Sequence, residues 1–407
     1  MKLFLFTDNF PYGFSEPFLE SEITFLTEKF EKIFVIPLFI KGEKRSVPKN
    51  VEIFKSIISF STKDKKNMLI NGIFNLSHFG FAVKEFFAEK VYKNVKHLWN
   101  FCTATLLFRA MFANKNLKKF LKKEVSKNDK FYFYWGNKSA FLVPVLKKYF
   151  PENKIFVRFH RTDLYKEVIP NFGYVPFRKH IFPAIDTFVP ISENGKSYLL
   201  ENYKSLVSEN KISVQHLGVF SKGKNQEKKN REVFHLLSCS WVVKVKRIDL
   251  IINALRNINI PICWTHIGSG ELMNEMQNAA KNLPKNVEVN FLGAMKNEEV
   301  MRYFTENHID LFINVSESEG VPVSIMEALS FGVPVLATDV GGTSEIVDNQ
   351  VGKLLNVNIS PKEISDIITT FASQNLTQMR ENSLLRWSER SNAEKNYRNF
   401  AEFLKSN

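Results

Sequence analysis

Two features are scarce in this sequence, and each shortage excludes a class of protein. The 407 residues include three cysteines, Cys102, Cys239 and Cys263, which lie far apart and form no C-x-x-C pair. A disulfide framework and a cysteine-based zinc site are therefore not expected. This use of cysteine is typical of a protein that works in a reducing cytoplasm.

Long apolar runs are also missing, although the chain has 39 Phe. No stretch approaches the roughly 18 to 20 uninterrupted apolar residues that a membrane-spanning helix needs. The apolar run at residues 3–6 is too short for a signal peptide, and polar turn residues follow it at once. We therefore expect a protein that is not integral to a membrane, with a first strand at residues 3–6.

Acidic residues are too few to balance the basic ones, and the imbalance is confined to the first half. The formal net charge is +14. Residues 1–200 carry 33 Lys and Arg against 18 Asp and Glu, whereas residues 201–407 carry 23 against 24. Residues 61–130 alone carry 15 against 5, interleaved with Phe, Leu, Ile and Trp. Such a basic helical region favours an anionic partner.

The second half alternates short apolar runs with amphipathic segments of helical length. We expect strands at residues 233–239, 262–267, 287–292, 310–314 and 334–338. We expect helices at residues 248–258, 271–283, 297–306 and 322–330. Four successive strand–loop–helix steps predict a doubly wound parallel sheet, in which ligands bind beyond the carboxyl ends of the strands.

The first half begins in the same way and is separated from the second by a polar linker. We expect its strands at residues 3–6, 33–38, 131–135, 155–159 and 187–190, with a helix at 17–29. Residues 221–232 contain almost no apolar side chain and are typical of a linker. We therefore predict an α/β protein with domains at residues 1–220 and 233–385. A last helix at residues 386–407 is expected to pack back on the first domain.

Residues 310–347 form the most informative segment. Its predicted strand ends near Asn314, a polar loop carries Glu317 and Glu319, and a helix with Glu327 begins near Val321. The unpaired N–H groups of a helix N-terminus suit a diphosphate. Carboxylates suit neutral diols better, because each accepts two hydrogen bonds from adjacent hydroxyls.

This segment resembles the donor-site signature of the GT-B fold, family 4 retaining glycosyltransferases. Seven residues separate Glu319 from Glu327, and Gly341, Gly342 and Glu345 follow. Shorter segments agree in order: VRFHRTD at 157–163, PISENG at 190–195, HLGV at 216–219, KRID at 246–249, GSGE at 268–271 and FLG at 291–293. The resemblance runs from the middle of the chain to about residue 355. It implies two Rossmann-like doubly wound domains facing a central cleft.

The resemblance also implies roles for individual residues. Glu327 would hold the ribose hydroxyls of the donor, Glu319 would hydrogen-bond the donor sugar, and Lys246 would neutralise the diphosphate. His160 would lie near the transferred sugar or the acceptor. The catalytic residues expected are thus His160, Glu319 and Lys246. The donor-binding residues expected are Glu327, Arg247, Gly320, Val321, Gly268, Gly293 and Gly13.

Two positions depart from the family pattern. Trp241 stands five residues before Lys246, where the family usually has an Arg that contacts the leaving group. Arg247 or Lys244 is an alternative source of that charge. The loop after the first predicted strand has a single glycine, Gly13, where the family favours a paired-glycine loop.

The sequence has no D-x-D pair, the usual way in which a transferase holds Mg²⁺ or Mn²⁺ on a diphosphate, and no His/Cys cluster to replace it. We therefore expect no metal ion and no other cofactor. The charge on the departing nucleoside diphosphate would then be met by Lys246 and by helix N-termini.

Together these features predict a glycosyltransferase that moves a sugar from a UDP- or GDP-sugar to a saccharide or lipid-linked acceptor with retention, in cell-surface polysaccharide or glycolipid synthesis. A sugar-nucleotide epimerase of the same fold, or a phosphorylase, is an alternative. A nucleic-acid-binding protein ranks below both, because the sequence contains no recognised RNA- or DNA-binding motif.

The basic region at residues 61–130 predicts where the enzyme works. Amphipathic helices rich in Lys and aromatic residues can lie in a membrane interface. We therefore expect a cytoplasmic protein, peripheral on the cytoplasmic face of an anionic membrane. The apolar residues expected to enter the interface are Ile70, Phe74, Phe79, Phe81, Phe86, Phe87, Leu98, Trp99, Leu106 and Phe108. The alternative is a pair of core-packed helices with a solvated basic face.

Overall fold

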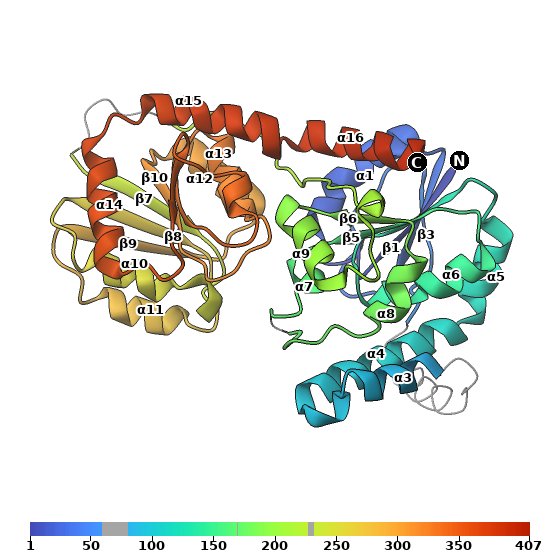
Figure 1. Cartoon of the computed structure of the whole chain (residues 1–407). Helices are drawn as coiled ribbons and strands as arrows, with labels where there is room; N and C mark the ends of the chain where they lie inside the picture. Colours follow the sequence, from blue (N-terminus) through green and yellow to red (C-terminus); the bar gives the residue numbers. More distant parts are fainter. Residues whose placement is uncertain (59–79, 169, 227–231) are drawn as a thin grey trace. The chain divides into compact units, whose positions relative to one another are not determined.

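The structure, a computed structural model, describes residues 1–58, 80–168, 170–226 and 232–407. Residues 61–79 of the basic region and 227–231 of the expected linker lie outside the described residues. The chain forms two compact units (Figure 1). The first contains Met1–Gln215 and Tyr397–Asn407, and the second contains His216–Asn396.

The first unit is built on a parallel sheet with the strand order β3-β2-β1-β4-β5-β6. Its strands are β1 (Lys2–Thr7), β2 (Lys32–Pro37), β3 (Val51–Ile53), β4 (Lys130–Phe133), β5 (Ile155–Phe159) and β6 (Thr187–Pro190). Five of the six residues of β1 are buried, because helices cover both faces of such a sheet and strand residues are apolar without alternation. Phe side chains fill the space: Phe4 stacks on Phe34 with ring centroids 5.2 Å apart.

Three helices of the first unit, α4 (Val95–Ala113), α5 (Lys115–Glu124) and α9 (Glu193–Tyr203), begin at residues whose side chains cap them. The unit also contains α1 (Pro17–Lys29), α3 (Gly80–Ala88), α6 (Val143–Tyr149), α7 (Arg161–Leu164) and α8 (Arg178–Ile181). The side chain of Asn94 accepts a hydrogen bond from the N–H of Lys96 at the start of α4, and Asn114 accepts one from Leu117 at the start of α5. Such caps satisfy N–H groups that the helix itself leaves unpaired.

The second unit repeats the plan with the strand order β12-β11-β10-β7-β8-β9. Its strands are β7 (Phe234–Cys239), β8 (Ile262–Ile267), β9 (Val287–Gly293), β10 (Leu311–Asn314), β11 (Val335–Thr338) and β12 (Gly352–Leu355). Its helices are α10 (Ile248–Leu255), α11 (Met273–Ala280), α12 (Asn297–Glu306), α13 (Val323–Ser330), α14 (Pro361–Ser373) and α15 (Thr377–Arg386). The predicted class, α/β with two doubly wound parallel sheets, is confirmed.

In each sheet the order of connection reverses at one place. The chain runs outward from β7 through β8 to β9, and then returns to place β10 on the other side of β7. The first sheet does the same between β1 and β4. Ligands of doubly wound proteins bind beyond the carboxyl ends of the strands at such a switch point.

The boundaries of the two units differ from those that the sequence composition predicted. The second unit starts at His216 and ends at Asn396, instead of spanning 233–385. Hydrogen bonds explain the difference: Val219 accepts one from the indole N–H of Trp387 at 3.0 Å, and Leu217 accepts one from the side chain of Asn396 at 2.8 Å. These bonds join the first residues of the second unit to its last residues. The final helix, α16 (Ala393–Ser406), begins seven residues later than expected.

From Tyr397 onward, α16 belongs to the first unit, where it lies beside α1 (Figure 1). Lys29 of α1 forms an ion pair with Glu402 at 2.5 Å. Under these helices, the guanidinium of Arg158 lies 4.1 Å from the ring centroid of Phe400. Among the described residues, no helix is long and apolar enough to cross a bilayer.

Arg158 belongs to a fully buried ion pair in the first unit. Its Nη1 lies 2.5 Å from Oε2 of Glu22, and both side chains are inaccessible to solvent. The hydroxyl of Tyr132 donates to the other oxygen of Glu22 at 2.9 Å. Removing one member of such a pair leaves an uncompensated buried charge.

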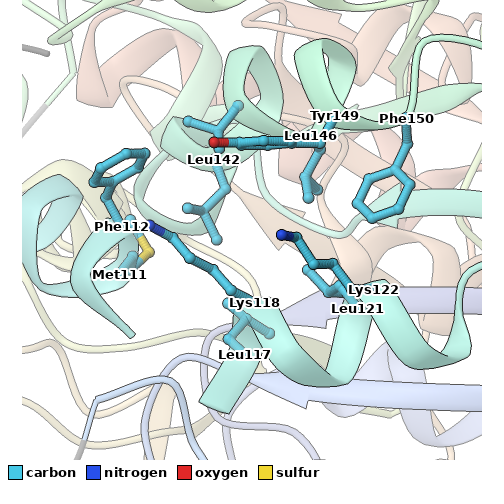
Figure 2. Close-up of a pocket in the computed structure, with 11 residues that line it drawn as sticks. Met111, Phe112, Leu117, Lys118, Leu121, Lys122, Leu142, Leu146, Tyr149 and Phe150 are labelled. Atoms are coloured by element: carbon cyan, nitrogen blue, oxygen red, sulfur yellow. The ribbon is translucent and has the colours of Figure 1, made fainter. Parts of the chain in front are cut away.

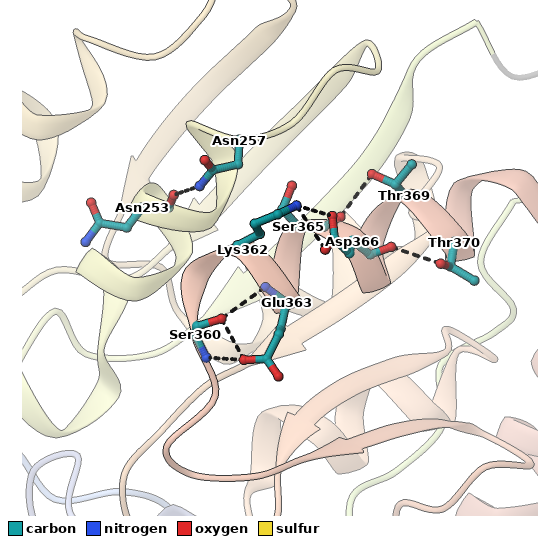
Figure 3. A network of polar contacts seen from close by, with 9 residues as sticks. All are labelled: Asn253, Asn257, Ser360, Lys362, Glu363, Ser365, Asp366, Thr369 and Thr370. Atoms are coloured by element: carbon teal, nitrogen blue, oxygen red, sulfur yellow. Dashed lines mark hydrogen bonds and ion pairs between the residues drawn. The ribbon is translucent and has the colours of Figure 1, made fainter.

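In the second unit, α14 carries an ion pair that is exposed to solvent, in contrast to the buried pair of the first unit (Figure 3). Ser360 and Glu363 form a reciprocal cap at its N-terminus. Lys362, in the same first turn, pairs with Asp366 at 3.2 Å, and both side chains are more than half exposed. Exposed pairs of this kind contribute little to stability, because water screens them.

We predict that Glu22→Ala lowers the free energy of unfolding by about 3 to 5 kcal/mol, because Arg158 stays buried without its partner. Urea denaturation followed by circular dichroism measures the change. Lys362→Ala is the control, and we expect little change from it. Equal effects of the two substitutions would contradict the importance of burial.

Candidate functional site

A Lys–Glu pair occupies the switch point of the second sheet. Lys246 follows β7 and Glu319 follows β10, which are hydrogen-bonded neighbours in the sheet. The two loops also bond directly, since the N–H of Glu317 donates to the carbonyl of Val245 at 2.8 Å. Nζ of Lys246 lies 2.6 Å from Oε1 of Glu319. The structure thus brings together two of the predicted catalytic residues.

The Glu319 carboxylate is held on a second side as well. The side-chain amide of Asn314, the last residue of β10, lies 3.3 Å from the same oxygen. The side chain of Glu319 is 9% exposed and that of Lys246 is 22% exposed. The pair is therefore partly shielded from water, which strengthens its electrostatic interaction.

Glu327 lies in α13 and is almost completely buried. Its Oε1 accepts a hydrogen bond of 2.6 Å from the side chain of Asn297, the first residue of α12. Burial raises the pKa of Glu327 to about 7, and the bond from Asn297 opposes the rise. Around neutral pH the group therefore exists in both protonation states.

The charges of Glu327 and Lys246 both act on the thiol of Cys239. Burial first, and then the charge of Glu327, raise the pKa of the Cys239 thiol to about 12, while the charge of Lys246 lowers it. Cys239 is the last residue of β7. Glu327 and Lys246 therefore both act on the carboxyl end of this central strand, and the thiol stays protonated.

The loop of Glu319 is fixed by the glycine pair that follows β11. Gly341 has a φ of +59°, and a Cβ there would lie 2.1 Å from the carbonyl oxygen of Glu319. The N–H of Gly342 donates to the carbonyl of Gly320 at 2.6 Å. Val321, next in the loop, is buried. The two glycines thus allow a backbone contact that any side chain would block.

Gly268 and Gly293 join the ends of β8 and β9. The N–H of Gly268 donates to the carbonyl of Gly293 at 2.8 Å. A Cβ on Gly268, whose φ is +144°, would lie 1.8 Å from the carbonyl oxygen of Ser240 in the loop after β7. Both glycines therefore position loops on the carboxyl side of the sheet, and their contact with a donor stays a prediction.

Arg247 directs its side chain elsewhere in the second unit. It adopts a left-handed conformation before α10, with a φ of 53°. Its Nη1 donates to the carbonyl of Val357, after β12, at 2.5 Å. The structure thus gives Arg247 a partner within the fold, and a role in neutralising a diphosphate stays a prediction.

In the first unit, His160 directly follows β5 and precedes α7. Its ring lies 4.8 Å from that of Tyr134 and 4.4 Å from that of Trp135, centroid to centroid. Burial, together with the charge of Arg158, holds the pKa of His160 well below its ordinary value. Within the described part of the chain, neither ring nitrogen has a hydrogen-bond partner. His160 is therefore a neutral imidazole with unused hydrogen-bonding capacity.

The loop after β1 is organised by Glu16, a residue that the sequence analysis missed. Its carboxylate accepts hydrogen bonds from the N–H groups of Asp8, Asn9 and Phe10 at 2.6 to 2.8 Å, and from the indole N–H of Trp135 at 2.8 Å. No sequence pattern indicates these bonds, because they depend on the folded loop and on a tryptophan 119 residues away.

Gly13 lies in the same loop and contacts the chain that follows β2. Its N–H donates to the carbonyl of Glu43 at 2.9 Å, and a Cβ on it would lie 2.6 Å from the carbonyl oxygen of Lys41. The sequence analysis also missed an ion pair nearby, in which Lys138 contacts Asp8. Asp8 follows β1 and Lys138 follows β4, so this pair lies at the switch point of the first sheet.

Residues 219–392 match the family model of Glycosyl transferases group 1. This stretch lies within the second unit and contains Lys246, Glu319 and Glu327. The match covers less than half of the chain and most of the second unit.

Curated relatives align with parts of the chain. The GtfA subunit of UDP-N-acetylglucosamine–peptide N-acetylglucosaminyltransferase from Streptococcus agalactiae is 27% identical over 194 residues, which are 46% of this chain and 37% of the relative. The amylovoran biosynthesis glycosyltransferase AmsK from Erwinia amylovora is 28% identical over 152 residues, 35% of this chain and 37% of the relative. The matched stretches thus span less than half the length of these two proteins.

Solved structures match over the whole chain. The lipopolysaccharide outer core galactosyltransferase WaaB has a TM-score of 0.68 at 15% identity, with 100% of both chains covered. Anabaena Alr3699/HepE, solved in complex with UDP-glucose, has a TM-score of 0.66 at 15% identity, again with 100% of both chains covered. At such identities the likeness concerns the fold, and it confirms the predicted GT-B fold.

We predict that Glu327 makes the free energy of unfolding depend on pH. Its pKa rises from an ordinary 4.5 to about 7 on folding, so the folded chain keeps a proton that the unfolded chain releases between these values. The free energy of unfolding contributed by Glu327 should therefore fall as pH rises through this interval, by on the order of 3 kcal/mol.

Glu327→Gln tests this prediction, because the amide keeps an oxygen for Asn297 and does not titrate. Urea denaturation of the wild type and the variant at several pH values gives the difference in unfolding free energy. A difference that stays constant across the interval would show that Glu327 has an ordinary pKa.

Proposed function

We propose that this protein is a glycosyltransferase that moves a sugar from a nucleoside diphosphate sugar to a saccharide or lipid-linked acceptor in cell-surface polysaccharide or glycolipid synthesis. The observation that carries the proposal is the Lys246–Glu319 pair at the switch point of the second sheet, within a stretch that matches group 1 glycosyl transferases and also contains buried Glu327. The name of the relative AmsK, an amylovoran biosynthesis glycosyltransferase, supports the polysaccharide setting.

The geometry suggests how the three residues divide the work. An ammonium group held at 2.6 Å from a carboxylate can exchange that carboxylate for a diphosphate, which carries more charge. Lys246 would then stabilise the charge that develops on the leaving group. Glu319, released from Lys246, would accept hydrogen bonds from the donor sugar, and Glu327 would accept them from the ribose.

Retention of configuration is part of the proposal and follows from the resemblance to family 4. The bond between the anomeric carbon and the leaving phosphate breaks, and the acceptor oxygen bonds to the same face of the sugar. The acceptor proton passes to an oxygen of the leaving phosphate. His160, a neutral imidazole, would orient the sugar or the acceptor by hydrogen bonding.

We propose a UDP-sugar as the donor, with a GDP-sugar as the second candidate. The support is that Anabaena HepE, which shares the fold, was solved with UDP-glucose. Transfer without a metal ion is proposed because the sequence has no D-x-D pair. The product distinguishes the proposed reaction from epimerisation by an enzyme of the same fold. Sugar transfer forms a new glycoside, whereas epimerisation leaves the sugar on its nucleotide or releases it unattached.

We further propose that the first unit attaches to an anionic membrane surface. Of the residues expected at the interface, Phe87, Leu98 and Trp99 are exposed, whereas Phe108 is buried in the core. Phe81, Phe86 and Leu106 are half-buried, and Ile70, Phe74 and Phe79 lie outside the described residues. Support for attachment thus comes from the exposed side chains of α3 and α4 and from the surrounding lysines.

We predict that Glu327→Ala weakens the binding of a UDP-sugar by about 10- to 100-fold, because charge-assisted hydrogen bonds to the ribose are lost. Isothermal titration calorimetry measures the affinity. Glu317→Ala removes an exposed carboxylate from the loop of Glu319 and should leave the affinity unchanged. Wild-type affinity in a folded Glu327→Ala protein would remove Glu327 from the donor site.

We also predict that the purified protein releases UDP from a UDP-sugar in excess EDTA. Lys246→Ala should lower kcat by about 100-fold or more, since Lys246 acts on charge that develops in the transition state. Lys362→Ala, which changes a distant surface lysine, is the control. Turnover that stops with EDTA and returns with Mn²⁺ would refute metal independence, and unchanged kcat in Lys246→Ala would refute the role of Lys246.

A further inference from the structure

An apolar pocket lies in the first unit, among α5, α6 and the C-terminal end of α4 (Figure 2). Its volume is about 140 Å³. Leu121, Leu142 and Leu146 line it and are almost fully buried. This volume is close to that of the roughly 150 Å³ apolar cavity that binds benzene. The pocket therefore suits a short run of methylene groups and not a sugar.

Two lysines border this apolar space. Lys118 and Lys122 are four residues apart on α5 and therefore lie on the same face of the helix. Figure 2 shows both side chains directed along the pocket, with their ammonium groups beside its apolar residues. Nζ of Lys118 lies 3.8 Å from the ring centroid of Phe112. Burial, and then the charge of Lys122, lower the pKa of Lys118.

These two charges have no acidic partner in the described part of the chain. The ion pairs of the described residues include neither Lys118 nor Lys122. Their neighbour Lys123, by contrast, lies 3.3 Å from Glu124. Two like charges on one helix face repel each other, and an anion between them relieves the repulsion.

An apolar pocket with two unneutralised ammonium groups is complementary to an anion that carries an apolar chain. Exposed aromatic side chains elsewhere in the unit indicate that this anion belongs to a lipid surface. Tyr149 on the edge of the pocket is 52% exposed, and Phe87 and Trp99 are 63% and 74% exposed. Such rings, together with lysines, are typical of proteins that contact the membrane interface.

We propose that this pocket holds a segment of one acyl chain of an anionic phospholipid, whose phosphate lies between Lys118 and Lys122. The inference rests on the proposed membrane attachment and makes it specific. The phospholipid would fix the orientation of the first unit on the membrane, because a single chain is held in a defined place. General attachment by a basic surface would not do so.

The test compares two double variants of the full chain that lose the same charge from the same helix. Lys118→Gln with Lys122→Gln alters the pocket, and Lys119→Gln with Lys123→Gln alters lysines that do not line it. Monomeric dihexanoylphosphatidylglycerol, below its micelle concentration, is titrated in a calorimeter. We expect the first pair to weaken binding about tenfold or more, because each ammonium group near a phosphate is lost, and the second pair to have little effect.

A third variant tests the apolar part of the site. Val145 lines the pocket and is only half-buried, so Val145→Phe fills the space with little demand on the core. It should weaken binding of the short-chain lipid without changing the circular dichroism spectrum. Equal binding of dihexanoylphosphatidylcholine would overturn the proposal, as would inorganic phosphate that binds as tightly as the lipid.

Vesicle co-sedimentation separates this inference from the attachment on which it rests. Vesicles that contain phosphatidylglycerol should bind the wild type and the Lys119/Lys123 variant, and should bind the Lys118/Lys122 variant more weakly. Equal weakening by both pairs would leave a general basic surface and overturn the pocket. Failure of every form to bind, or equal binding to neutral vesicles at high salt, would overturn the electrostatic attachment itself.

Discussion

The reversal of connection at the centre of each parallel sheet determines where charged side chains can gather. Strands buried on both faces are mostly apolar, with the paired Arg158 of β5 as an exception, so most charged groups lie in the loops at the strand ends. At the switch point the loops after two adjacent strands meet, as those after β7 and β10 do through Lys246 and Glu319. The pair formed by Asp8 and Lys138 obeys the same constraint between β1 and β4.

Most of this architecture could be predicted from the sequence, because in the second half the hydrophobic periodicity and the polar loop segments indicate the same helices and strands. The bounds expected for β8 and α12 are those of the structure. Short edge strands were missed: β3 and β12 have three and four residues, too few for a pattern to emerge. The domain limits were also misplaced, since composition does not show the hydrogen bonds that tie Leu217 and Val219 to the C-terminal segment.

The candidate site was predictable to a different degree in each unit. Spacing within one segment placed Glu319 and Glu327 on a loop and the following helix, and the structure brings Lys246 to Glu319. Glu16 could not be found in this way, because its role depends on three N–H groups of a folded loop and on Trp135, more than a hundred residues away. Residues that belong to a recognised motif could be predicted, whereas Glu16, which belongs to none, could not.

Glu16 also explains why the two units would treat anions differently. A loop whose N–H groups converge is an anion site, and in the first unit the carboxylate of Glu16 already fills that position. A diphosphate approaching this loop would have to displace a buried carboxylate. In the second unit, the loop after β7 holds the ammonium group of Lys246, a charge that attracts an anion. Under the proposed function, the diphosphate of a donor would therefore be met by Lys246 rather than by the loop after β1.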